Sequence, residues 1–271
     1  MTSFHFRNMK LLAAVAAALL FTANVTLAQT KPAVTDLGAT KPGNVIFIGN
    51  SFFYYNNSLH NHVGLLVRSG GDKISNVSVT ISGSGIDWHD VDSYFRPHAI
   101  GSYSFDAHNN IVFNNREKLF DVAIIMDCSQ CPIHPKLKDV FTEYAKKDAE
   151  IARKHGTEPV FFMSWAYSDH PEMTAQLAEA YTVAGNANHA LVIPAGLAFA
   201  RSLKERPTLI LNVEDRRHPT LAGTYLAACT VYASLLKKSP EGLKYTAGLP
   251  EADAKFLQTI AWKTVQEYHG K

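Results

Sequence analysis

The sequence predicts an α/β fold in which helices cover both faces of a central parallel sheet. Short apolar runs of strand length alternate with longer helical patterns along the chain. The apolar runs are continuous, as in the stretch from Val122 to Met126, and do not alternate with polar residues. Continuous runs are typical of strands that are covered on both faces, so we expect a three-layer, doubly wound sandwich.

The first half of the chain predicts three strands and one helix. The apolar run that starts at Val45 and ends before Asn50 predicts a strand at 45–49. A helical pattern follows at 58–69, and further apolar runs predict strands at 77–82 and 121–126.

The second half predicts two strands and four helices. Pro219 suits the first turn of a helix, where its missing N–H costs nothing, so one helix is expected to begin there. The strands are expected at 159–164 and 190–193, and the helices at 136–155, 171–186, 219–237 and 251–268.

The first 28 residues have the features of a secretory signal peptide. Arg7 and Lys10 precede an apolar stretch at 11–25, and a small-residue cleavage site ends at Ala28. A membrane anchor is the alternative, but the apolar stretch falls short of the ~20 residues that a spanning helix needs. We expect a signal peptide at 1–28 and a secreted or periplasmic protein with no membrane span after cleavage.

The rest of the chain predicts one domain without a nucleic-acid partner. Residues 29–43 are polar and contain prolines, as expected of a linker, and residues 44–271 fit a single domain. Without Arg7 and Lys10 the 26 basic residues become 24, which equals the 24 acidic ones. A nucleic-acid binder needs a basic excess, so that class is excluded.

The three cysteines predict a structural role more readily than a chemical one. Cys128 and Cys131 form a Cys-x-x-Cys turn, and a disulfide between them is possible in an oxidising compartment. A zinc site would need further ligands at matching spacing, and Pro132 disfavours the helix that redox motifs use. Cys229 lies in an apolar segment and is expected in the core. No metal site is predicted.

Two polar motifs that follow strand regions predict a catalytic site. Asp215 stands three residues before His218, so its carboxylate can reach one imidazole nitrogen and leave the other free as a base. Ser51 follows the first strand, where open α/β sheets place their chemistry. We therefore expect a Ser51, His218 and Asp215 triad. The alternative is that Asp215 only caps the following helix.

Acyl transfer also needs donors for the developing oxyanion. The backbone amide of Ser51 is one candidate, and that of Gly83 is a second, although a plain turn explains the glycine equally well. The glycines at 83 and 85 do not complete a dinucleotide fingerprint, because Trp88 occupies the last glycine position. No cofactor is predicted, and no Gly-x-Ser-x-Gly elbow occurs.

The blocks at 49–51, 82–84 and 215–220 together resemble those of the SGNH, or GDSL-like, hydrolase family, with Asn50 where many members have Asp. The resemblance spans residues 45–236 and is closest to an exported bacterial branch with a Gly-Asn-Ser nucleophile block. That branch also continues into Trp-His, as at 88–89, and into Gly-x-Tyr-Leu-Ala-Ala, as at 223–228. The resemblance implies a flavodoxin-like three-layer α/β/α sandwich and ester hydrolysis through an acyl-serine intermediate.

One block departs from the family pattern. Members usually place an asparagine after the third strand as an oxyanion donor, whereas Cys128 occupies that slot here and is a poor donor. Gln130 has a suitable amide and is the substitute that we expect, although it could equally be a solvated turn residue.

Two functions follow from these patterns. The first is a serine esterase that acts on a carbohydrate O-acyl or small acyl ester, with the aromatic run at 52–55 as a pocket lining or as core. The second is a binding protein that keeps the scaffold without turnover.

Overall fold

The computed structural model describes residues 30–97, 99–100, 103–113, 116 and 118–270, and the expected signal peptide lies outside them. Its centre is a five-stranded parallel sheet in the order β2-β1-β5-β6-β7. This is the flavodoxin-like order of a doubly wound fold, so the predicted architecture is confirmed. The strands are β1 (Asn44–Gly49), β2 (Ser75–Thr80), β5 (Val122–Ile125), β6 (Glu158–Phe162) and β7 (Leu191–Ile193).

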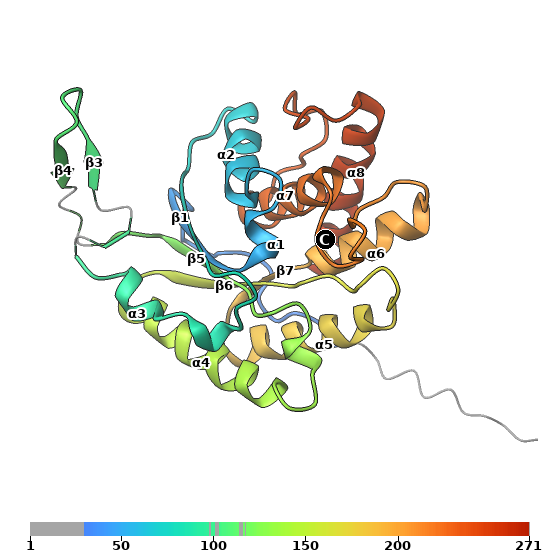
Figure 1. Ribbon diagram of the computed structural model, residues 1–271, viewed down its shortest axis with the longest axis horizontal. Coiled ribbons are helices and arrows are strands. Elements are labelled where there is room, and N and C mark those ends of the chain that lie inside the picture. The colour runs from blue at the N-terminus through green and yellow to red at the C-terminus, as the bar shows by residue number, and fades with distance from the viewer. Residues whose placement is uncertain (1–29, 98, 101–102, 114–115, 117, 271) are drawn as a thin grey trace, which may run out of the picture.

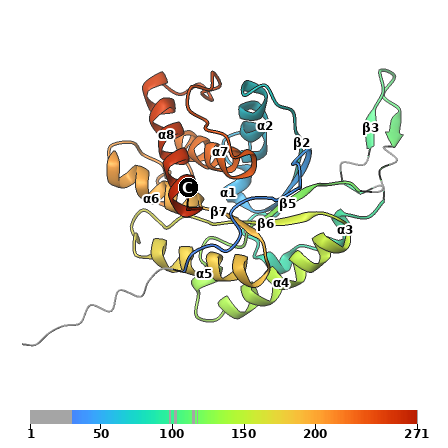
Figure 2. The ribbon, with the colours of Figure 1, turned by 180° about the vertical axis from the view of Figure 1, so that it is seen from behind.

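Helices form a layer on each face of the sheet (Figures 1 and 2). β1 explains why its apolar run is continuous: Val45 and Phe47 pack into one core cluster, while Ile46 and Ile48 pack into the other. The first layer contains α1 (Ser51–Tyr54), α2 (Leu59–Ser69), α6 (Ala195–Glu205), α7 (Leu221–Leu236) and α8 (Glu251–Tyr268). The second contains α3 (Val91–Tyr94), α4 (Lys138–Lys154) and α5 (Met173–Ala187).

The helix that follows the expected catalytic loop is the most deeply buried one. Every residue of α7 from Ala222 to Leu235 is buried, and the helix packs against α2, α6 and α8. A Cβ on Gly223 would lie 2.4 Å from the Leu211 carbonyl oxygen, so only glycine lets α7 approach the preceding segment this closely. The start of α7, and with it the loop before it, is therefore fixed against the core.

Several short elements were not predicted from the sequence. They include a projecting hairpin of β3 (Tyr103–Phe105) and β4 (Ile111–Phe113), whose strands are exposed (Figure 1). Two single-turn helices, η1 (Ile86–Trp88) and η2 (Cys131–Ile133), are too short for any periodic pattern. α6 follows β7 almost directly, so its apolar residues continue the strand's apolar run and hide the boundary.

The segment expected to be a linker contacts the domain in the residues described. The Thr30 hydroxyl donates to Glu179 on α5, and the Ala33 amide donates to Asn186 at 2.7 Å. Val34 and Leu37 pack against the first core cluster. Among the described residues, no helix is long and apolar enough to span a membrane.

Asp148 on α4 is a buried carboxyl group, with 1% of its surface exposed and no hydrogen-bond partner for Oδ2. Burial raises the pKa of Asp148 to about 7, and only Lys147 opposes this. Between about pH 4 and pH 7 the folded protein therefore holds a proton that the unfolded chain has lost, so this group's contribution to stability falls as the pH rises.

We predict that Asp148→Asn will stabilise the protein more at pH 8 than at pH 5, because asparagine removes the buried charge. The difference should be on the order of 2 kcal/mol in the free energy of unfolding, measured by urea denaturation at both pH values. Asp139→Asn, on the exposed side of the same helix, is the control and should show no comparable difference. An equal effect of Asp148→Asn at both pH values would contradict a protonated buried carboxyl.

Candidate active site

The candidate site lies at the carboxyl edge of the sheet. Ser51 is the first residue of α1 and directly follows β1 and Asn50. His218 and Asp215 come from a loop closed by a bridge between Asn212 and Pro219. The chain thus brings residues from near its two ends together at one place.

The loop holds its acid and its histidine in a fixed relation. Asp215 Oδ1 accepts the backbone N–H groups of Arg217 and His218, both at 2.9 Å. Arg216 adopts a left-handed conformation (φ 65°) and turns the chain between the two residues. Asp215 Oδ2 is then 2.5 Å from His218 Nδ1. One carboxylate therefore shapes the loop and orients the imidazole ring.

Ser51, His218 and Asp215 form a continuous hydrogen-bonded chain, because His218 Nε2 is 2.8 Å from Ser51 Oγ. Partial burial alone would raise the pKa of Asp215, but the hydrogen bonds from His218 and from the Arg217 amide lower it to about 2. An ionised Asp215 accepts a hydrogen bond from the N–H at Nδ1, which leaves Nε2 free to accept the serine proton.

Aromatic residues hold the imidazole ring in place. Tyr55 stacks on His218 with ring centres 4.3 Å apart, and Phe52 contacts it edge-on at 5.6 Å. Phe52 also stacks on Trp165, whose Nε1 donates to the Arg217 carbonyl at 2.9 Å. In the aromatic run at 52–55, Phe52 and Phe53 belong to the core, and Tyr54 is exposed.

A buried amide joins the nucleophile turn to two other loops. Asn50 Nδ2 donates to the Ser84 carbonyl at 3.1 Å and to the Asp127 carbonyl at 3.2 Å. Its Oδ1 accepts the Phe52 amide and so caps α1. The loops that follow β1, β2 and β5 therefore meet at one side chain.

Three donors converge on the carbonyl of Gly49, just before this turn. They are the Ile81 amide at 3.1 Å, the Ser84 hydroxyl at 3.3 Å and His89 Nε2 at 3.1 Å. Burial lowers the pKa of His89, which keeps the ring neutral, and Nδ1 is 3.1 Å from the Tyr94 hydroxyl. Sequence reasoning missed His89 and Trp165 as site-supporting residues, because their roles depend on contacts between distant segments.

Gly83 lies beside the nucleophile turn in a left-handed conformation (φ 70°), and no atom occupies the space where a Cβ would stand. A side chain there would be strained, so this turn requires glycine. The next residue, Ser84, is buried and accepts the Asn50 amide through its carbonyl. The Gly83 backbone is thus held next to the turn at Gly49 and Asn50 by the contacts of Ser84.

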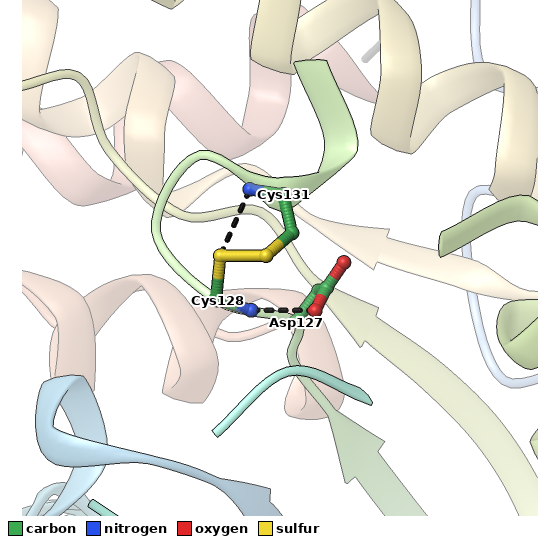
Figure 3. Close-up of side chains that lie close together, drawn as sticks. All are labelled: Asp127, Cys128 and Cys131. Carbon is green, nitrogen blue, oxygen red and sulfur yellow. Dashed lines mark hydrogen bonds between the residues drawn. A yellow bond between two sulfur atoms is a disulfide. The ribbon is translucent and has the colours of Figure 1, made fainter. Parts of the chain in front are cut away.

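The loop after β5 contains a disulfide between Cys128 and Cys131 (Figure 3). Asp127 anchors the loop, since its Oδ1 accepts the amides of Cys128 and Ile86 at 2.7 and 2.8 Å. These three side chains also lie close enough to hold a metal, but the disulfide removes both thiolates. Cys128 Sγ has no proton to donate, so in this state Cys128 cannot fill the family's donor position.

Gln130 is placed differently from the triad. It is exposed within the disulfide loop, and its side chain lines a pocket shared with Tyr167 and Arg217. The described residues offer its amide no hydrogen bond, and the pocket does not include Ser51 or His218.

Comparison with solved structures identifies the fold. A DUF4886 family protein from Bacteroides uniformis matches with a TM-score of 0.62 at 19% identity, over 82% of this chain and 94% of its own. A candidate SGNH hydrolase from Slackia heliotrinireducens matches with a TM-score of 0.50 at 19% identity, over 72% of this chain and 99% of its own. The chain has the SGNH hydrolase fold.

An acetylxylan esterase from Geobacillus stearothermophilus shares this SGNH hydrolase fold, with a TM-score of 0.50, 17% identity, and coverage of 72% of this chain and 95% of its own. No protein-family model matches the sequence, and no curated protein matches it.

We predict that Asn50→Asp will damage this site even though many SGNH members have aspartate at that position. A carboxylate cannot donate, and it would face the carbonyl oxygens of Ser84 and Asp127. The substitution should lower the free energy of unfolding by about 3 kcal/mol, measured by urea denaturation. Asn50→Ala, which loses the donors without adding a charge, should cost less, and wild-type stability of Asn50→Asp would show that the three loops do not depend on this amide.

Proposed function

We propose that the protein is an exported serine hydrolase that cleaves an ester through an acyl-serine intermediate. The observation that carries the proposal is the hydrogen-bonded chain from Ser51 through His218 to Asp215. Nucleophile, base and orienting acid are at hydrogen-bond distance, which is the geometry that acyl transfer requires.

The chemistry follows from the donors and acceptors of the triad. His218 Nε2 takes the Ser51 proton as Oγ attacks the ester carbonyl, and Asp215 stabilises the imidazolium that forms. The same imidazolium then protonates the leaving alcohol, and the acyl group stays on Ser51. A water molecule, activated by the neutral His218, attacks the acyl-enzyme and releases the acid, which restores the free serine.

Three groups are proposed to stabilise the oxyanion. The amides of Ser51 and Gly83 lie at adjacent loops, where Asn50 and Ser84 hold the backbone. Gln130 is the proposed side-chain donor, and it would have to turn away from its pocket towards Ser51 when substrate binds. In enzymes from which one such donor has been removed by mutation, the transition state loses about 3 kcal/mol of stabilisation.

Two further observations support the finer parts of the proposal. A disulfide persists in an oxidising compartment, which agrees with a secreted or periplasmic location. Exposed Tyr54 near the site offers an aromatic surface for a sugar ring, and an acetylxylan esterase shares the fold. A carbohydrate O-acyl ester or a small acyl ester is the proposed substrate class.

The triad predicts how hydrolysis and probe labelling respond to substitution. The reaction to measure is hydrolysis of a nitrophenyl acyl ester, in which His218 has to accept the serine proton. His218→Ala should lower kcat by at least about a thousandfold. A fluorophosphonate probe should label the wild type and not Ser51→Ala. Folded wild-type protein that resists the probe would favour a binding protein without turnover.

The role of Gln130 as an oxyanion donor is tested by whether removal of its amide changes kcat or KM. As an oxyanion donor, Gln130→Ala should lower kcat by about a hundredfold with little change in KM, since the donor acts in the transition state. A rise in KM with unchanged kcat would place Gln130 in substrate binding instead.

A further inference from the structure

A second recognition site adjoins the proposed catalytic loop. The pocket that contains Gln130 and Arg217 has a volume of about 360 Å³. It lies between the loop after β5, the loop after β6 and the segment that carries His218. All three segments are at the carboxyl edge of the sheet, where ligands bind in open α/β folds.

The backbone of Arg217 is fixed at both its N–H and its carbonyl group. The amide donates to Asp215, and the carbonyl accepts from Trp165 Nε1 at 2.9 Å and from Asn212 Nδ2 at 3.1 Å. The guanidinium group lies over the ring of Tyr167, 4.7 Å from its centre. The guanidinium group is therefore held against Tyr167, on the residue that directly precedes His218 in the chain.

The acidic groups of the pocket already have partners. Asp169 Oδ2 accepts from Arg216 Nη1 at 3.1 Å, and Glu172 Oε1 is 3.0 Å from His170 Nδ1. The Asp169 carboxylate is thus balanced by Arg216, the Glu172 carboxylate has a hydrogen-bond partner in His170, and neither pairs with Arg217.

Two groups of the pocket can donate hydrogen bonds to a ligand. The Arg217 guanidinium has no carboxylate partner among the described residues. His134 Nδ1 accepts the Lys136 amide at 3.2 Å, so the ring proton is on Nε2. A guanidinium and an imidazole N–H are donors that suit an anionic oxygen group.

The reaction determines which part of the substrate comes here. His218 has to protonate the leaving oxygen, so the alcohol lies on the imidazole side of the ester bond, and Arg217 precedes His218 in the same loop. The amides of Ser51 and Gly83 lie in the segments that follow β1 and β2, whereas this pocket is lined by the loops that follow β5 and β6. The alcohol portion, and not the carbonyl oxygen, is the part that reaches the pocket.

We infer that this pocket binds a carboxylate on the alcohol portion of the ester, with Arg217 as the anchoring residue and His134 as a further donor. The inference rests on the proposed function, and it narrows the substrate to O-acylated acids. The carboxylate could belong to a sugar acid or to a simple hydroxy acid.

The test compares esters that differ only in this charge. One pair is the acetyl ester of methyl glucuronoside against that of methyl glucoside, and the other is 3-acetoxybenzoate against 3-acetoxybenzyl alcohol. For each pair the measured quantity is the ratio of kcat/KM for the acidic over the neutral ester. Arg217→Gln should lower that ratio about tenfold in at least one pair, and Arg217→Lys should lower it less. An effect in the glucuronoside pair indicates a sugar acid, and an effect in the acetoxybenzoate pair indicates a hydroxy acid.

Arg68→Gln, which removes an exposed charge from α2, is the control and should leave both ratios unchanged. Ratios that Arg217→Gln does not alter would overturn the inference while the esterase proposal stands. If no ester is cleaved and no probe labels Ser51, the proposed function fails. The pocket is then tested alone, by comparing the melting temperature of the protein with glucuronate and with glucose. Stabilisation by glucuronate that Arg217→Gln abolishes supports the pocket, and equal shifts in both proteins overturn it.

Discussion

One buried amide holds the functional edge of this molecule together. In a parallel sheet each strand delivers its following loop to the same edge, but nothing in the sheet itself fixes those loops to one another. Asn50 supplies the connection, because its donors reach the loops after β2 and β5 while its oxygen caps α1. The position of Ser51 is thereby set by tertiary contacts and not only by the end of its strand.

The other half of the site has its own internal organisation. Asp215 accepts hydrogen bonds from two backbone amides of its loop and from the imidazole N–H. These contacts shape the loop without any contribution from Ser51. Trp165, in the segment after β6, then fixes the loop through the Arg217 carbonyl. The two units meet through the hydrogen bond between His218 and Ser51, and the Asn56 amide adds a second one to the Pro219 carbonyl at 2.9 Å. The rings of Tyr55 and Phe52 also contact the imidazole.

The long elements could be predicted from the sequence because their patterns are local and repeated. β1, β5, β6 and β7 are short runs that are buried almost throughout, and α4 and α8 have helical patterns of ample length. β2, at the sheet edge, is only partly buried and alternates polar with apolar residues. The hairpin of β3 and β4 could not be predicted, because its strands have three residues each and face solvent. α6 was missed because no polar gap separates it from β7.

The residues of the candidate site also differ in whether a local sequence pattern could reveal them. The proximity of Asp215 and His218 follows from a spacing of three residues, and Ser51 follows from its place after a strand. The roles of His89, Trp165 and Asn50 depend on partners more than thirty residues away, which no local pattern reveals. Gln130 was assigned by chemical type alone, and its direction depends on how the disulfide loop turns.

The burial of α7 determines when, during synthesis of the chain, the loop with His218 becomes fixed. Ser51 is synthesised early, but His218 stands just before a helix that is buried on all sides and is covered by α8. Until α8 has emerged, α7 lacks a large part of its cover, and the loop with His218 lacks a firm support. A growing chain therefore carries Ser51 through most of translation without a fixed His218 to bond it.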